Sequence, residues 1–152
     1  MNALFLLKSK ATVSVCYDDN TVRRGMQTLR DSGFTAIPVI TRDGDYAGSV
    51  SEGDFLWYLY DHPDAKPESV RLSSLLRRGW NPAVTVDVSM EDLMQRAANQ
   101  NFVPVVDDRN KFIGIITRRD ILAYYYEREH TEEDAGGAPV LCVVPDGRMR
   151  QA

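Results

Sequence analysis

Residues 36–56, AIPVITRDGDYAGSVSEGDFL, recur without a gap as residues 102–122, FVPVVDDRNKFIGIITRRDIL. Each copy begins with an apolar run at a proline, passes through a turn, and continues into a second apolar run that ends in Gly-x-x-[Ser/Thr]-x-x-Asp. Pro38 aligns with Pro104 at a separation of 66 residues, and the other matched positions keep that separation. A repeat of this kind indicates a duplicated supersecondary unit, so we predict two copies of one fold unit.

The elements of each copy follow from residue type. Proline lacks an N–H and suits the start of a strand, while Gly44 and Asn110 tolerate the positive φ of a tight turn. Upstream of each hairpin, Thr21 and Ser89 can cap an amphipathic helix, and Gly33 can end the first of these helices. One more strand is expected before each helix, at residues 11–17 and 83–87. The predicted order is strand, helix, strand, strand, helix, twice, which is an α/β (α+β) chain.

We divide the 152-residue chain into four parts: residues 1–60 as the first repeat, 61–69 as a linker, 70–130 as the second repeat and 131–152 as a partly disordered tail. Residues 70–78 are expected to form a short helix that ends at Arg77 and Arg78, where cations favour the helix dipole.

Composition excludes several classes of protein. A formal net charge of −4 argues against a broad nucleic-acid-binding face, which needs clustered Lys and Arg. The longest apolar run near the N-terminus, residues 3–7, is too short for a membrane span or a signal-peptide core. Two cysteines without a CxxC pair support neither a disulfide framework nor a zinc site. We therefore expect a cytoplasmic protein without a metal site, a bound cofactor or a membrane association.

The paired motifs Gly48–Asp54 and Gly114–Asp120 resemble those of the tandem CBS-domain pair, also called a Bateman module. The resemblance covers residues 11–126, and the chain is similar to the small, stand-alone CBS-only proteins of Gram-positive bacteria. It implies two βαββα repeats packed with pseudo-twofold symmetry and two clefts between them. It also implies a regulatory adenine nucleotide as ligand (AMP, ADP, ATP, cyclic di-AMP or S-adenosylmethionine), with a partner protein that receives the signal.

The residues themselves suit a nucleotide. Ser51 and Thr117 each lie where a strand meets a helix, and a helix N-terminus attracts phosphate. Asp54 and Asp120 follow one turn later, where a carboxylate can accept bonds from both hydroxyls of a ribose. Gly48 and Gly114, three residues before each hydroxyl, would let the backbone approach a ligand closely. The alternative is a capping box, which has the same spacing and needs no ligand; the two interpretations are compatible.

The two clefts are expected to differ in strength. The second motif carries two arginines, which bind phosphate in a bidentate way, so its cleft is predicted to be the stronger anion site. The resemblance places the following residues in that cleft: Thr12, Val13, Ser14, Thr35, Ala36, Ile37, Pro38, Thr117, Arg118, Arg119 and Asp120. The counterpart cleft would contain Ser51, Asp54, Ala83, Val84, Asn101, Phe102, Val103 and Pro104.

The helix after each motif is rich in aromatic residues, at 55–60 and 121–126, and exposed aromatic patches often mark interfaces. We therefore predict a homodimer. The function indicated by these observations is a non-catalytic, nucleotide-sensing regulatory module. Two alternatives stay open: a nucleotide-hydrolysing enzyme, although no nucleophile–base or carboxylate cluster is evident, and a nucleic-acid-binding protein.

Overall fold

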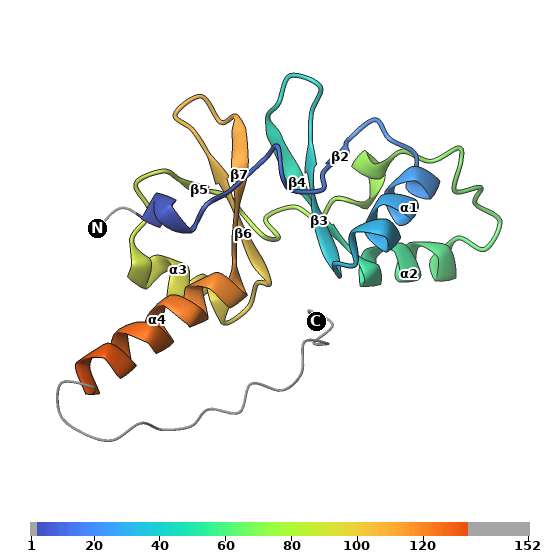
Figure 1. Ribbon diagram of the computed structural model, residues 1–152. Helices are drawn as coiled ribbons and strands as arrows, with labels where there is room; N and C mark the ends of the chain where they lie inside the picture. Colours follow the sequence, from blue (N-terminus) through green and yellow to red (C-terminus); the bar gives the residue numbers. More distant parts are fainter. Residues whose placement is uncertain (1–2, 134–152) are drawn as a thin grey trace.

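Two sheets, each flanked by two helices, make up the computed structural model (Figure 1). The structure describes residues 3–133, so the predicted tail from residue 134 onward lies outside the described residues. The first repeat contains β2 (Cys16–Tyr17), α1 (Val22–Ser32), β3 (Ala36–Ile40), β4 (Tyr46–Ser51) and α2 (Glu52–Asp61). The second contains β5 (Val84–Thr85), α3 (Met90–Ala97), β6 (Phe102–Val106), β7 (Phe112–Thr117) and α4 (Arg118–Glu133). The predicted order of elements is confirmed in both copies.

The two hairpins match each other in register. In the first, β3 and β4 are antiparallel and place Ile37 opposite Val50, while the short strand β2 runs parallel to β3. In the second, Val103 lies opposite Ile116, and β5 runs parallel to β6. Each hairpin has a register shift at the same place, after Val39 in one copy and after Val105 in the other. The duplication therefore extends to the irregularities of the sheets.

The predicted helix ends are confirmed. Thr21 Oγ1 accepts the Arg24 N–H at 3.1 Å, and Ser89 Oγ accepts the Asp92 N–H at 3.1 Å. Gly33 ends α1 in the left-handed conformation, with φ of 71°, which glycine adopts without a steric cost. The inner faces of α1 and α3 are buried in separate cores, formed around Val22 and Leu29 in one repeat and around Leu93 and Ala97 in the other.

Two elements are shorter than predicted. The strands expected over residues 11–17 and 83–87 pair over two residues each, as β2 and β5. The helix predicted over residues 70–78 is wrong: this segment holds only a 3₁₀ turn, η2 (Leu72–Leu75), whose two leucines are buried. Arg77 and Arg78 lie beyond the end of η2, so the expected contact of these arginines with a helix dipole is wrong too.

The segment before each repeat packs on the other repeat. The N-terminal 3₁₀ turn η1 (Ala3–Leu6) and strand β1 (Lys8–Ser9) join the second repeat, where β1 pairs antiparallel with β7 (Figure 1). Ala3 is fully buried in the second core, and Leu72 is fully buried in the first. The packing therefore crosses the predicted boundaries at residues 60 and 70.

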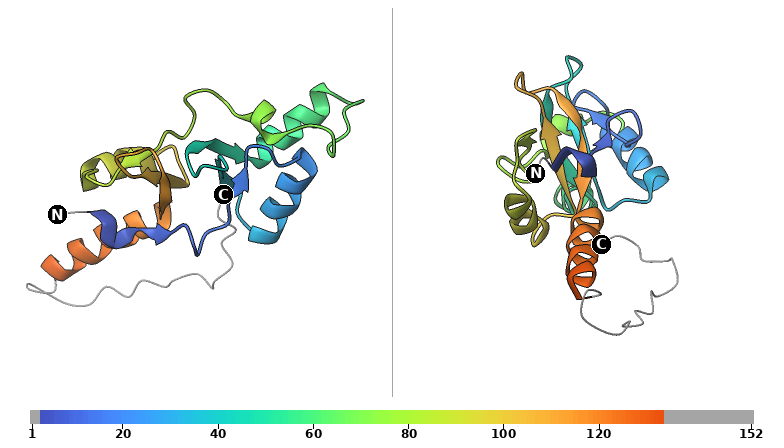
Figure 2. Two further views of the ribbon diagram at one scale, coloured as in Figure 1. Left: turned by 90° about the horizontal axis from the view of Figure 1, so that it is seen from above. Right: turned by 60° about the vertical axis from the view of Figure 1, so that its left-hand side comes forward.

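The predicted pseudo-twofold arrangement is visible in contacts between equivalent residues. Lys111 Nζ lies 2.9 Å from Asp45 Oδ1 at the hairpin tips, and Asn101 Nδ2 donates to Thr35 Oγ1 at 3.0 Å at the opposite ends of the sheets. Each pair joins a residue to its counterpart 66 positions later. The two repeats therefore face one another across an axis between the hairpins, as the further views show (Figure 2).

Candidate functional site

A cleft opens between the two repeats, at the end of the hairpins opposite their tips. Its lining comes from both copies: Val13, Ser14, Phe34, Thr35, Ala36, Ile37, Pro38, Asn101, Phe102, Ile115 and Thr117. The cleft encloses about 390 Å³, counted out to its opening to solvent. Its interior is narrow, with little more room than a water molecule needs, so a purine ring requires the facing side chains to separate.

The cleft unites most of the residues that the sequence assigned to the stronger site. Seven of the eleven line it, and they are Val13, Ser14, Thr35, Ala36, Ile37, Pro38 and Thr117. Thr12 does not line it, because its N–H and hydroxyl both donate to Ser9 O at 2.9 Å in a turn. Asn101 and Phe102 were assigned to the counterpart cleft, but they line this one. As counterparts of Thr35 and Ala36, they stand close to the axis that the two repeats share.

Thr117 lies at the base of this cleft, where β7 passes into α4. Thr117 is only 3% exposed, and its Oγ1 accepts the Asp120 N–H at 3.2 Å. The Asp120 carboxylate is loosely held: within residues 3–133 its charged contact is Lys8 Nζ, at 3.6 Å from Oδ2. That distance exceeds a hydrogen bond, so the carboxylate keeps its acceptor positions for other donors.

The two arginines of the second motif do not line the cleft. Arg118 Nε donates to Gln100 O at 3.1 Å, and this bond connects α4 to the loop that leads into β6. Arg119 is exposed, and within the described part of the chain its side chain has no hydrogen bond or ion pair. Both residues lie in the first turn of α4.

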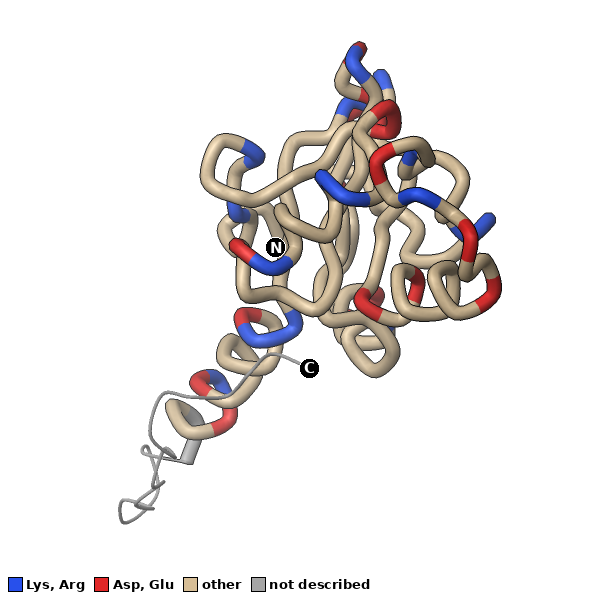
Figure 3. The backbone as a smooth tube through the Cα atoms, turned by 90° about the vertical axis from the view of Figure 1, so that its right-hand side faces the viewer, with Lys and Arg blue, Asp and Glu red and all other residues tan. Residues whose placement is uncertain are grey.

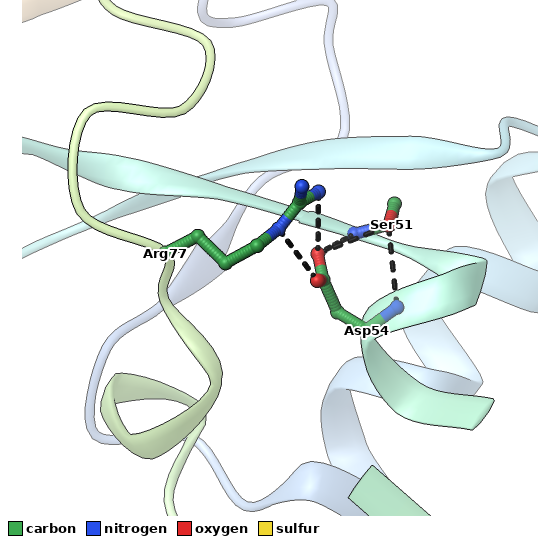
Figure 4. Close-up of polar contacts among 3 residues, drawn as sticks. All are labelled: Ser51, Asp54 and Arg77. Atoms are coloured by element: carbon green, nitrogen blue, oxygen red, sulfur yellow. Dashed lines mark hydrogen bonds and ion pairs between the residues drawn. The ribbon is translucent and has the colours of Figure 1, made fainter. Parts of the chain in front are cut away.

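In the equivalent corner of the first repeat, Ser51 and Asp54 bond to each other and to Arg77 (Figure 4). Asp54 Oδ2 accepts the Ser51 N–H at 2.8 Å and the Ser51 hydroxyl at 3.0 Å, and Ser51 Oγ accepts the Asp54 N–H at 3.3 Å. Both halves of a capping box are thus present. Arg77 completes the corner, with its Nε 2.8 Å from Asp54 Oδ1. Sequence reasoning missed this role because Arg77 lies outside the repeated segment.

The remaining residues of the predicted counterpart cleft are dispersed. Ala83 and Val84 line a polar surface hollow beside α3 together with Asp87 and Asp92. Val103 and Pro104 are buried within β6. The structure therefore does not bring this set together as one site.

A polar network occupies the part of β4 that corresponds to the cleft wall of the second repeat. Ser49 is the counterpart of Ile115, and its hydroxyl lies 2.7 Å from the Tyr46 hydroxyl and accepts from Asn81 Nδ2 at 3.2 Å. The Tyr46 hydroxyl also donates to Asn81 O at 2.7 Å. Burial raises the pKa of Tyr46, so this phenol stays protonated and its hydrogen bonds persist at neutral pH. The network ties the segment before β5 to the first repeat.

The space beside each of the two motif glycines is filled by another segment of the chain and not left for a ligand, which corrects the interpretation from the sequence. A Cβ on Gly114 would lie 2.1 Å from Lys8 O, and a Cβ on Gly48 would lie 3.1 Å from Leu76 Cδ2. Each glycine therefore makes room for the segment that crosses over from outside its own repeat.

The CBS-domain pattern matches residues 9–61 and 74–127, which together exceed half of the chain. The chain belongs to the CBS-domain family. Its two CBS repeats coincide with the two sheets described above, and the cleft lies between them.

The chain is similar in sequence or in structure to several known proteins. MJ0188, an uncharacterized protein of Methanocaldococcus jannaschii, is 26% identical over 127 residues, which cover 82% of this chain and 43% of that protein. The chain thus spans less than half the length of this relative. CbpB in complex with c-di-AMP superposes with a TM-score of 0.79 at 23% identity, covering 89% of this chain and 91% of CbpB. CBSX2 in complex with AMP has a TM-score of 0.71 at 19% identity, covering 84% and 98%. At these identities the structural likeness shows the fold alone.

Two further features bear on the CBS pair. Within residues 3–133, no three His, Cys, Asp or Glu side chains are grouped so that they could hold a metal ion. No helix in the same range combines the length and apolarity needed to cross a bilayer.

Proposed function

We propose that this CBS pair is a non-catalytic regulatory module that binds an adenine nucleotide between its repeats and signals the bound state to a partner protein. The observation that carries the proposal is the cleft lined by both repeats, with Thr117 at its base and a weakly engaged Asp120 carboxylate beside it. CbpB with c-di-AMP and CBSX2 with AMP, which share the fold, support the choice of ligand class.

The lining fits a nucleoside in two ways. Its walls are mainly apolar, as at Ile37, Phe102 and Ile115, and such walls favour an aromatic base over a small ion. The N-terminus of α4, where Thr117 lines the cleft, attracts phosphate. A ligand would separate Thr35 from Asn101, whose hydrogen bond joins the two repeats. Binding is thereby linked to the relative position of the two repeats, and a partner protein could sense this change in position.

Charge is consistent with a small ligand rather than with nucleic acid. Lys and Arg positions are interspersed with Asp and Glu positions over the face seen in Figure 3. A polynucleotide requires a continuous basic surface to release counterions, whereas one nucleotide requires only one helix terminus and a few donors.

A thermal-shift panel of AMP, ADP, ATP, cyclic di-AMP and S-adenosylmethionine tests the proposal. A ligand present at 100 times its dissociation constant stabilises the folded state by about 2.7 kcal/mol. Asp120→Asn should abolish the shift, while Asp108→Asn, at the exposed hairpin tip, should preserve it. No shift with any of the five ligands would contradict the proposal, and conversion of ATP to products with Mg²⁺ would indicate the enzyme alternative.

A further inference from the structure

The Asp54 carboxylate has too few free acceptor positions to bind both hydroxyls of a ribose. A carboxylate offers about four lone-pair sites on its two oxygens. At Asp54, Oδ2 accepts from Ser51 N, Ser51 Oγ and Arg77 Nη2, at 2.8, 3.0 and 3.4 Å. The Oδ1 atom pairs with Arg77 Nε at 2.8 Å. The hydroxyls of a ribose could bind here only by displacing Arg77 (Figure 4).

Arg77 is held in place by a second contact. Its Cζ lies 3.9 Å above the Trp80 ring, close enough for a cation–π interaction. The Asp54 side chain is only 10% exposed, so its charge is poorly solvated without the guanidinium. Displacement of Arg77 by an uncharged sugar would leave this carboxylate partly buried and without a counter-charge.

Asp120 has none of these constraints. Lys8 lies 3.6 Å away, and the Lys8 and Asp120 side chains are 49% and 31% exposed. Exposed pairs of this kind contribute little to stability, and a lysine carries a single flexible charge where an arginine presents a planar fork. A sugar can therefore reach Asp120 at a much smaller cost than it can reach Asp54.

We propose that Arg77 is a built-in ligand of the Ser51–Asp54 corner, so that the chain binds one nucleotide, in the cleft containing Thr117, and keeps the second corner closed. The inference rests on the proposed function for the identity of the ligand, but the closure of the corner is a property of the protein alone. Arg77 thus determines how many nucleotides are bound and which of the two motif corners binds one.

Equilibrium dialysis with AMP counts the sites. Wild-type protein should bind one AMP per chain at saturation, and Asp120→Asn should bind none. Arg77→Gln should acquire a second, weaker site, because the Asp54 carboxylate regains free acceptor positions. Arg78→Gln, which removes the charge of the neighbouring exposed arginine, is the matched control and should still bind one AMP per chain. Circular dichroism establishes that each variant is folded.

Two AMP per chain in the wild type would overturn the inference, and so would one AMP per chain in a folded Arg77→Gln variant. If AMP binds to no variant, the proposed function fails for this ligand, and the closed corner is decided by NMR instead. The Arg77 Nε–Hε signal should exchange with water more slowly than that of Arg78 and should lose this protection in Asp54→Asn. Equal exchange of the two arginines in the wild type would refute the closed corner.

Discussion

Replacement of Gly114 by alanine should detach the N-terminal strand from the second repeat. The new Cβ would lie 2.1 Å from Lys8 O and 3.0 Å from Leu7 Cδ1. The first contact involves backbone, so β1 must move away from β7 and lose its pairing at Lys8 and Ser9, together with the bond from Lys10 N to Ile113 O. Two or three hydrogen bonds at about 1 kcal/mol each, with loosened apolar packing of the same segment, give a loss of about 2–4 kcal/mol.

Two glycines of the first repeat provide matched controls. Gly48 and Gly114 have φ values of 153° and 158°, so alanine has the same backbone cost at both positions. At Gly48 the nearest atom is Leu76 Cδ2 at 3.1 Å, the end of a flexible side chain. This contact costs about 1 kcal/mol, against about 2–4 kcal/mol at Gly114, and both figures add to the shared backbone cost. Gly53 lies in α2 with its nearest neighbour at 3.7 Å, so Gly53→Ala should stabilise by up to about 1 kcal/mol.

Urea unfolding followed by circular dichroism measures all three changes. The free energy of unfolding should decrease most for Gly114→Ala, decrease less for Gly48→Ala and increase for Gly53→Ala. In addition, amide exchange at Lys8 and Lys10 should accelerate in Gly114→Ala alone. If Gly114→Ala and Gly48→Ala lose equal stability and β1 remains protected, the argument from the Lys8 carbonyl is wrong.

Three further outcomes are expected. Arg118→Ala should weaken AMP binding by about 1–2 kcal/mol, because a positive charge at the start of α4 is lost. Unchanged affinity in dialysis would show that Arg118 has no part in binding and only bonds to Gln100. Iodoacetamide should modify Cys16 slowly at pH 8 in the folded protein, because the residue is only 1% exposed and burial raises the pKa of its thiol. Rapid modification of Cys16, mapped by mass spectrometry, would contradict its burial. Light scattering should give twice the chain mass of 17.2 kDa, and Trp57→Asp should give the monomer, because Trp57 is 60% exposed on α2; a monomeric wild type at micromolar concentration would refute the homodimer.

The duplicated hairpins were predictable because their pattern encodes burial directly. Apolar residues that alternate or run together between a proline and a turn can form little other than paired strands, and equal spacing fixed which residues correspond. The helix caps at Thr21 and Ser89 were equally readable, because a short polar side chain before an amphipathic run has one common use.

The first strand of each repeat was harder to predict, because apolar residues there serve two purposes. Val13 and Val15 look like strand residues, but they pack against the cluster between the repeats, and Val13 also lines the cleft. Only Cys16 and Tyr17 pair in the sheet. A local pattern cannot distinguish an apolar residue that faces its own sheet from one that faces the other repeat.

The two motif corners differ because their charged partners come from outside the repeated stretches. Within the repeated segments, Ser51 and Asp54 correspond to Thr117 and Asp120, and an alignment of the copies predicts two similar sites. The basic residue that meets each aspartate comes from the segment before a repeated stretch: Lys8 from the N-terminal strand, and Arg77 from the chain between the two stretches. The segment between the repeats supplies an arginine at 2.8 Å, whereas the N-terminal segment supplies a lysine at 3.6 Å. Because a charged partner decides whether a carboxylate can accept from a sugar, the difference between the sites originates outside the gapless repeat of residues 36–56 and 102–122.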